Sequence, residues 1–82
     1  MLKAEGMQPG FPDMLIFDAP PADDAFIGVA IEMKRADGKG KVTELQQDWL
    51  IALAARGWKT KVCHGAVDAM RFLASLGYRL PS

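Results

Sequence analysis

The sequence has little with which to cross-link the chain or anchor it. Cys63 is its only cysteine, so it can form no internal disulfide and offers no second thiol to hold zinc. No apolar run is long enough to cross a membrane, and the N-terminus lacks the charged segment and apolar core of a secretory signal. We therefore expect a cytoplasmic protein whose single thiol stays reduced.

The length and composition predict one small globular domain over residues 1–82. Half of the 82 residues are hydrophobic and 24% are charged, which is ordinary for a folded protein and unlike a disordered one. A chain of this size buries a core that is only marginally stable alone, so burial against a partner subunit often helps.

The net charge is zero, but the charges are unevenly distributed along the chain. Residues 1–33 hold six acids against one base, whereas residues 34–61 hold seven bases against three acids. The bases of that middle segment are Lys34, Arg35, Lys39, Lys41, Arg56, Lys59 and Lys61. They could lie along a polyanion, although on charge alone solvated loop and helix positions are the simpler explanation.

Hydrophobic patterning predicts an α/β domain with the order strand, strand, helix, strand, helix. The strand after the first helix can join the sheet in parallel, which makes the sheet mixed. The expected elements are strands at 14–17 and 26–35, an amphipathic helix at 43–56, a half-exposed strand at 58–64 and a last helix at 66–76.

The second predicted strand has two dissimilar faces. Val29, Ile31 and Met33 make one face apolar, whereas the other carries Gly28, Ala30, Glu32 and Lys34. If the first two strands form a hairpin with Phe17 near Ile27, Asp13 lies opposite Ile31 and beside Glu32. Two carboxylates and a lysine would then converge at one end of the hairpin.

These three side chains suit a metal-dependent reaction at phosphate. Two acids held close together bind a hard divalent cation such as Mg²⁺ or Mn²⁺, because the metal relieves their repulsion. A lysine on the same face can deprotonate a water or stabilise the charge that develops on a phosphate during attack. An Asp with a Glu-x-Lys is a weak pattern by itself, and a surface ion pair is the alternative.

Four spaced segments resemble a known family. GFPDMLIF, then GVAIEMKR, then GKVTELQQDWLIALAARGW and a short strand resemble the virus-type replication-repair nuclease (VRR-NUC) domain of the PD-(D/E)XK superfamily. The resemblance covers nearly everything from Leu2 to Leu76. It implies a restriction-endonuclease-like core and a homodimeric, metal-dependent endonuclease for branched DNA, such as Holliday junctions or flaps. It also implies a role in DNA repair, in a bacterium or a phage-infected host cell.

The resemblance also implies the residues of the site. Asp13 with Pro12 matches the PD motif, Glu32 and Lys34 match the E-x-K motif, and Gln46 matches the glutamine that opens the following helix. In this superfamily the acids and the carbonyl of the residue between acid and lysine hold the metal. The implied catalytic residues are Asp13, Glu32, Lys34 and Gln46, and the implied metal ligands are Asp13, Glu32 and Met33.

Family members usually begin with a further helix that carries another acid. This sequence starts too late to contain that helix, and Glu5 is the only acid before Asp13. A DNA-binding or protein-interaction module that has lost catalysis is therefore the alternative to an active nuclease.

One residue of the implied site, Gln46, has two explanations. Gln46 stands three residues after Thr43, so a capping box at the helix start explains it as well as a site role does. Arg35, Lys39 and Lys41 directly follow the site strand and are the expected phosphate contacts.

The remaining conspicuous side chains have structural explanations. Cys63 and His64 are neighbours on a strand and point to opposite faces, so we expect structural or surface roles and no nucleophile pair. We expect Trp49 to pack in the core and Trp58 to lie in the core or at a dimer contact.

Overall fold

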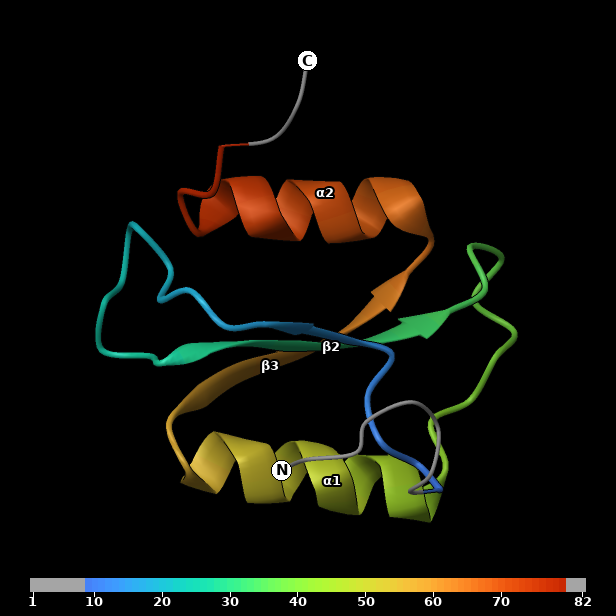
Figure 1. The fold of residues 1–82 in the computed structure, drawn as a ribbon. Helices are drawn as coiled ribbons and strands as arrows, with labels where there is room; N and C mark the ends of the chain where they lie inside the picture. The colour runs from blue at the N-terminus through green and yellow to red at the C-terminus, as the bar shows by residue number, and fades with distance from the viewer. Residues whose placement is uncertain (1–8, 80–82) are drawn as a thin grey trace.

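A helix covers each face of a small mixed sheet (Figure 1). The computed structural model describes residues 9–79. The elements in this range are β1 (Met14–Ile16), β2 (Gly28–Lys34), α1 (Glu44–Ala55), β3 (Trp58–His64) and α2 (Ala66–Ser75). The predicted α/β class and element order are confirmed. None of the described helices is long and apolar enough to cross a membrane.

The sheet combines both kinds of strand pairing. In the described part of the chain its order is β1-β2-β3, with β1 antiparallel and β3 parallel to β2. The crossover from β2 to β3 runs through α1, as a parallel pair requires. β2 is therefore the central strand of the sheet. It begins with apolar residues and ends with Glu32, Met33 and Lys34.

The predicted register between the first two strands was wrong by one residue. Met14, and not Asp13, pairs with Ile31. The prediction assumed a regular hairpin up to Phe17, but β1 ends at Ile16 and the Phe17 side chain is 72% exposed. The connection is instead positioned by α2, since the Ala22 N–H donates to the Leu76 carbonyl at 2.9 Å.

The apolar face of β2 packs under α2. Val29, Ile31, Cys63 and Ala69 form the buried cluster there, and Phe72 packs against it. This confirms the predicted apolar face of β2. The second face begins with a glycine because neighbouring atoms leave no room for a side chain. A Cβ on Gly28 would come within 2.7 Å of the Trp58 ring and would also collide with the Ile16 carbonyl.

The two tryptophans lie at the margins of the fold. Trp49 lies on α1 and is half-buried, with its ring 4.9 Å from the Phe11 ring and its indole N–H donating to the Pro9 carbonyl at 3.1 Å. It therefore joins the segment before β1 to α1 and is not part of the buried cluster. Trp58 is half-buried against Phe17, 5.5 Å away between ring centres.

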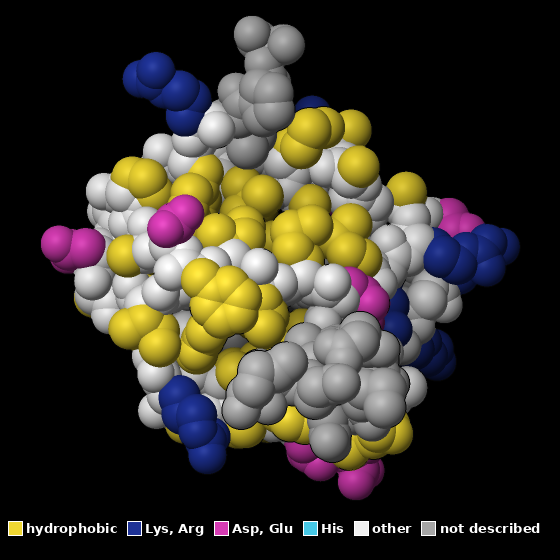
Figure 2. All heavy atoms as spheres, in the orientation of Figure 1, with side chains coloured by type: hydrophobic (Ala, Val, Ile, Leu, Met, Phe, Trp, Pro, Cys, Tyr) yellow, Lys and Arg dark blue, Asp and Glu magenta, His cyan; other side chains and the backbone are white. Residues whose placement is uncertain are grey.

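Part of the apolar surface stays exposed. Figure 2 shows hydrophobic side chains gathered across the middle of one face, between the two helices. The large exposed hydrophobic residues of the described chain are Met14, Phe17, Ile27, Leu45, Ile51, Val67 and Met70.

Candidate active site

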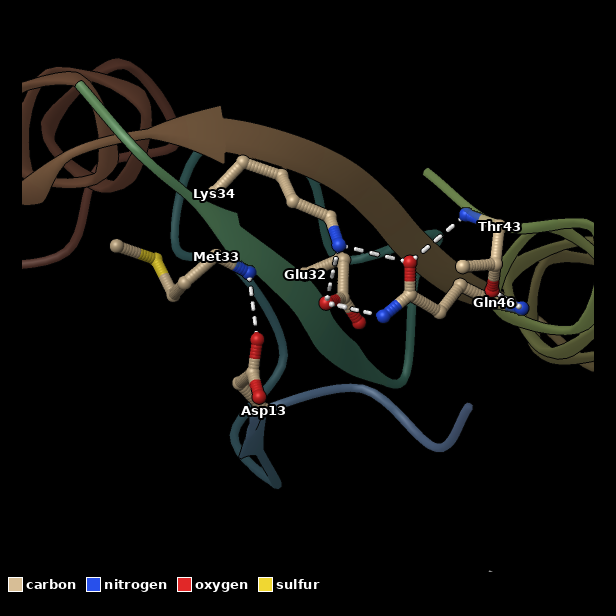
Figure 3. A network of polar contacts seen from close by, with 6 residues as sticks. All are labelled: Asp13, Glu32, Met33, Lys34, Thr43 and Gln46. Carbon is tan, nitrogen blue, oxygen red and sulfur yellow. Dashed lines mark hydrogen bonds and ion pairs between the residues drawn. The ribbon is translucent and has the colours of Figure 1, made fainter. Parts of the chain in front are cut away.

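The predicted site residues meet at the end of β2 (Figure 3). Glu32 and Lys34 lie on β2 itself, Asp13 stands immediately before β1, and Gln46 lies in the first turn of α1. Antiparallel pairing brings the start of β1 to the end of β2, and the connection after Lys34 returns the start of α1 to the same place.

Asp13 extends the strand ladder with its side chain. Its Oδ2 accepts a hydrogen bond from the Met33 N–H at 2.8 Å, so the carboxylate takes the place of a further backbone partner from the short β1. The observed register matters here, because a slip of one residue moves side chains to the other face of a sheet. Pairing of Met14 with Ile31 sets Asp13 level with Glu32.

Glu32 is a buried carboxylate with one unsatisfied oxygen. The residue is 3% exposed, and its Oε2 accepts a hydrogen bond from Gln46 Nε2 at 3.1 Å. Its Oε1 is buried and has no hydrogen-bond partner. Burial raises the pKa of Glu32, and the neighbouring Asp13 carboxyl raises it further, against a smaller opposing effect of Lys34. The surroundings of Glu32 therefore disfavour its ionised form.

Gln46 serves the helix cap and the site with the same side chain. Its Oε1 accepts hydrogen bonds from the Lys34 ammonium at 2.8 Å and from the Thr43 N–H at 2.9 Å. The Gln46 N–H in turn donates to Thr43 Oγ1 at 3.1 Å, which completes the predicted capping box. The two readings that the sequence left open are thus compatible.

The cap also decides which way the Gln46 amide faces. An ammonium and a backbone N–H can only donate, so both require the Gln46 oxygen and leave the amide nitrogen for Glu32. Sequence analysis did not predict that the backbone of Thr43 orients a site residue. The signal that could have indicated it is the three-residue spacing between Thr43 and Gln46.

Lys34 is held in a largely buried position. Its side chain is 14% exposed, and its Nζ lies 3.6 Å from Glu32 Oε2 in addition to the Gln46 contact. At 3.6 Å the contact between Lys34 and Glu32 is an ion pair, because it is too long for a hydrogen bond. An ammonium has three donors, so Lys34 retains capacity to bind a substrate oxygen.

The predicted basic residues lie on the connection that follows β2. Arg35 Nη2 pairs with Asp37 Oδ2 at 2.6 Å, and Asp37 Oδ1 accepts the Lys39 N–H at 2.9 Å. Arg35 is therefore partly neutralised within a tight turn. Lys39 and Lys41 are exposed on the same connection.

Two carboxylates, one of which has an oxygen without a hydrogen-bond partner, fit a divalent cation. Within residues 9–79 no group of three Asp, Glu, His or Cys side chains is arranged to hold a metal, so the acids available are Asp13 and Glu32. Mg²⁺ characteristically uses one or two carboxylates and keeps several waters. The Oε1 of Glu32 offers such an ion a buried acceptor with no competing donor. Glu5 lies outside the described residues.

Cys63 and His64 do not form a pair. Cys63 is fully buried under α2, where burial raises the pKa of its thiol, whereas His64 is exposed on the opposite face. The predicted separation is confirmed.

Comparison with known proteins identifies the family of this chain. The family model described as the VRR-NUC domain matches residues 1–67, a range that contains β1, β2, α1, β3 and all the residues of the predicted site. Searches of curated proteins and of solved structures gave no match. Because the family model covers most of the chain, this protein belongs to the VRR-NUC family of nuclease domains.

Proposed function

We propose that the protein is a metal-dependent, structure-selective DNA endonuclease that hydrolyses phosphodiester bonds, on branched DNA such as Holliday junctions or flaps. One observation carries the proposal. A nuclease-family chain gathers two carboxylates and a largely buried lysine at the end of one strand, and one carboxylate oxygen there has no partner.

The residues that would hold the metal are Asp13, Glu32 and the carbonyl of Met33. Mg²⁺ or Mn²⁺ bound there would supply Lewis-acid chemistry, which activates water and offsets negative charge on phosphate. The protein positions each acid with one hydrogen bond, since Asp13 accepts from the Met33 N–H and Glu32 accepts from Gln46 Nε2.

Lys34 acts on the phosphate. Both of its contacts, Gln46 Oε1 and Glu32 Oε2, are acceptors, which suits an ammonium that donates. Of the two roles that the sequence allows, stabilising the charge that develops on the phosphate therefore fits better than removing a proton from water. Gln46 orients the ammonium and is itself oriented by Thr43.

The connection after β2 supplies contacts to the DNA backbone. Lys39 and Lys41 are exposed beside the site and bind phosphates. Arg35 contributes less, since Asp37 already neutralises part of its charge.

The active form is a homodimer. A domain of this size gains stability from a partner, and the exposed apolar side chains in Figure 2 offer surface that a partner would bury. A two-fold dimer also presents two sites to a symmetric DNA junction.

A panel of labelled DNAs tests the function. A four-way junction, a flap, a linear duplex and a single strand of matched sequence are incubated with the protein in Mg²⁺, Mn²⁺ or EDTA. We expect cleavage in either metal, none in EDTA, and faster cleavage of a branched substrate. Binding of the DNAs without cleavage in either metal would instead indicate the non-catalytic module.

A further inference from the structure

The pairing of β2 with β3 places His64 beside Lys34, although the proposed mechanism gives His64 no role. Lys34 and His64 are direct partners in this parallel ladder. Paired residues project to the same side of a sheet, and neighbouring strands lie about 4.8 Å apart. His64 therefore stands next to Lys34 on the face that carries the site.

The backbone of His64 is fixed while its ring is exposed. The His64 N–H donates to Asp68 Oδ2 at 2.7 Å, and the following Gly65 N–H donates to the Lys34 carbonyl at 3.0 Å. Among residues 9–79, the hydrogen bonds of His64 involve its backbone and not its ring. The residue is exposed, although its neighbour Cys63 is fully buried on the other face.

The polar groups run across the end of the sheet in a definite order. Asp13 stands at the β1 side, Glu32 and Lys34 on β2, and His64 at the β3 side. The order across the three strands is thus an acid, then an acid with a lysine, then an imidazole. Asp68, the acid that contacts His64, is already engaged with the His64 backbone.

We infer that His64 is a further binding residue of this site, and that its imidazole donates to a phosphate oxygen of the DNA strand lying over Lys34. The inference rests on the proposed nuclease function. A phosphodiester bound near the acids and Lys34 would be bounded on the β3 side by His64, and an imidazole N–H is a suitable donor to phosphate.

His64→Ala and His64→Gln test this role, with Arg71→Ala as the control. Arg71 is exposed on α2, which covers the opposite face of the sheet. Its replacement by alanine removes a full positive charge. Affinity for a four-way junction is measured in Ca²⁺, and single-turnover cleavage in Mg²⁺. We expect His64→Ala to weaken binding about tenfold, as loss of a hydrogen bond to a charged group implies. His64→Gln should recover most of this affinity, and Arg71→Ala should change it less than about threefold.

Nuclear magnetic resonance gives a second readout, because His64 is the only histidine in the sequence. Its ring signals should shift when the junction is added to the wild-type protein. Equal binding by His64→Ala and wild type, or ring signals that do not move at saturating DNA, would overturn the inference. Absence of cleavage by the wild type would count against the proposed nuclease function alone, since binding and ring signals would still decide the role of His64.

Discussion

Replacing Glu32 with glutamine should stabilise the metal-free protein and abolish its response to metal. Glu32 is 3% exposed, and its Oε1 has no hydrogen-bond partner. Its pKa is raised by burial and by Asp13, which shows that the surroundings as a whole disfavour the ionised carboxylate. Glutamine has the same shape without the charge, and its amide can keep the Gln46 contact.

The expected size of the effect follows from two opposing terms. A buried polar atom without a partner costs about 1–3 kcal/mol, and the substitution relieves the charged part of that cost. Against this, Lys34 loses an ion pair of 3.6 Å but keeps its 2.8 Å hydrogen bond to Gln46. We expect a net gain of about 1 kcal/mol, which raises the midpoint of a domain of this size by about 4–8 °C.

The gain should depend on pH in a defined direction. A raised pKa means that folded Glu32 binds its proton more tightly than unfolded Glu32. The stabilising contribution of that proton is complete below the unfolded-state pKa and is lost as the pH rises through the folded-state pKa. Wild type and Glu32→Gln should therefore be similarly stable in acid and diverge towards neutral pH.

Thermal unfolding in EDTA and in Mg²⁺ measures both effects. At about 100 times the dissociation constant, a bound ion stabilises the native state by about 2.7 kcal/mol, so the wild type should overtake the variant in metal. Asp24→Asn, at an exposed position of the connection between β1 and β2, is the control and should behave as wild type. A lower midpoint of Glu32→Gln in EDTA, or an equal gain of both proteins in Mg²⁺, would refute this reasoning.

Three further predictions concern the lysine, the cap and the dimer. Lys34→Ala should keep Mn²⁺ binding in calorimetry and lose cleavage, because the lysine acts on phosphate; loss of the metal as well would show that the roles are not separate. Thr43→Pro should lower the cleavage rate more than Thr43→Ala at equal DNA binding, since both remove the hydroxyl but only proline removes the N–H that orients Gln46. The backbone φ of −75° at Thr43 suits proline, and equal rates would argue against orientation by the cap. The protein should sediment as a dimer at micromolar concentration and melt at lower temperature on dilution, whereas a monomer with a concentration-independent midpoint would rule the dimer out.

The elements were predictable because their signals are local. Alternation along β2 and β3 follows from the two-residue period of a strand, and the predicted strand at 58–64 coincides with β3. The predicted helix 43–56 differs from α1 by its two capping residues, Thr43 and Arg56. The register of β1 was not predictable in this way, because it depends on where the connection between β1 and β2 docks against the end of α2.

The candidate site was predictable in its members but not in its contacts. A shared face for Glu32 and Lys34 follows from their spacing, and the structure brings Asp13 and Gln46 to them. The neighbour of Lys34 on β3 could not be predicted, since the parallel register is set by α1 packing across the crossover and not by any local pattern. Trp49 has the spacing of a core residue, but its ring packs against Phe11, which is far away in the sequence, and lies outside the buried cluster.

Cleavage of one labelled four-way junction by the wild type and by Asp13→Asn tests the central claim most directly. Asp13 is exposed and makes its structural hydrogen bond through one oxygen, so the asparagine variant can fold and still accept the Met33 N–H. The account predicts cleavage by the wild type in Mg²⁺, none after EDTA is added, and none by Asp13→Asn in Mg²⁺. Cleavage that persists in EDTA, or that is unchanged in Asp13→Asn, would contradict a metal-dependent reaction at this site.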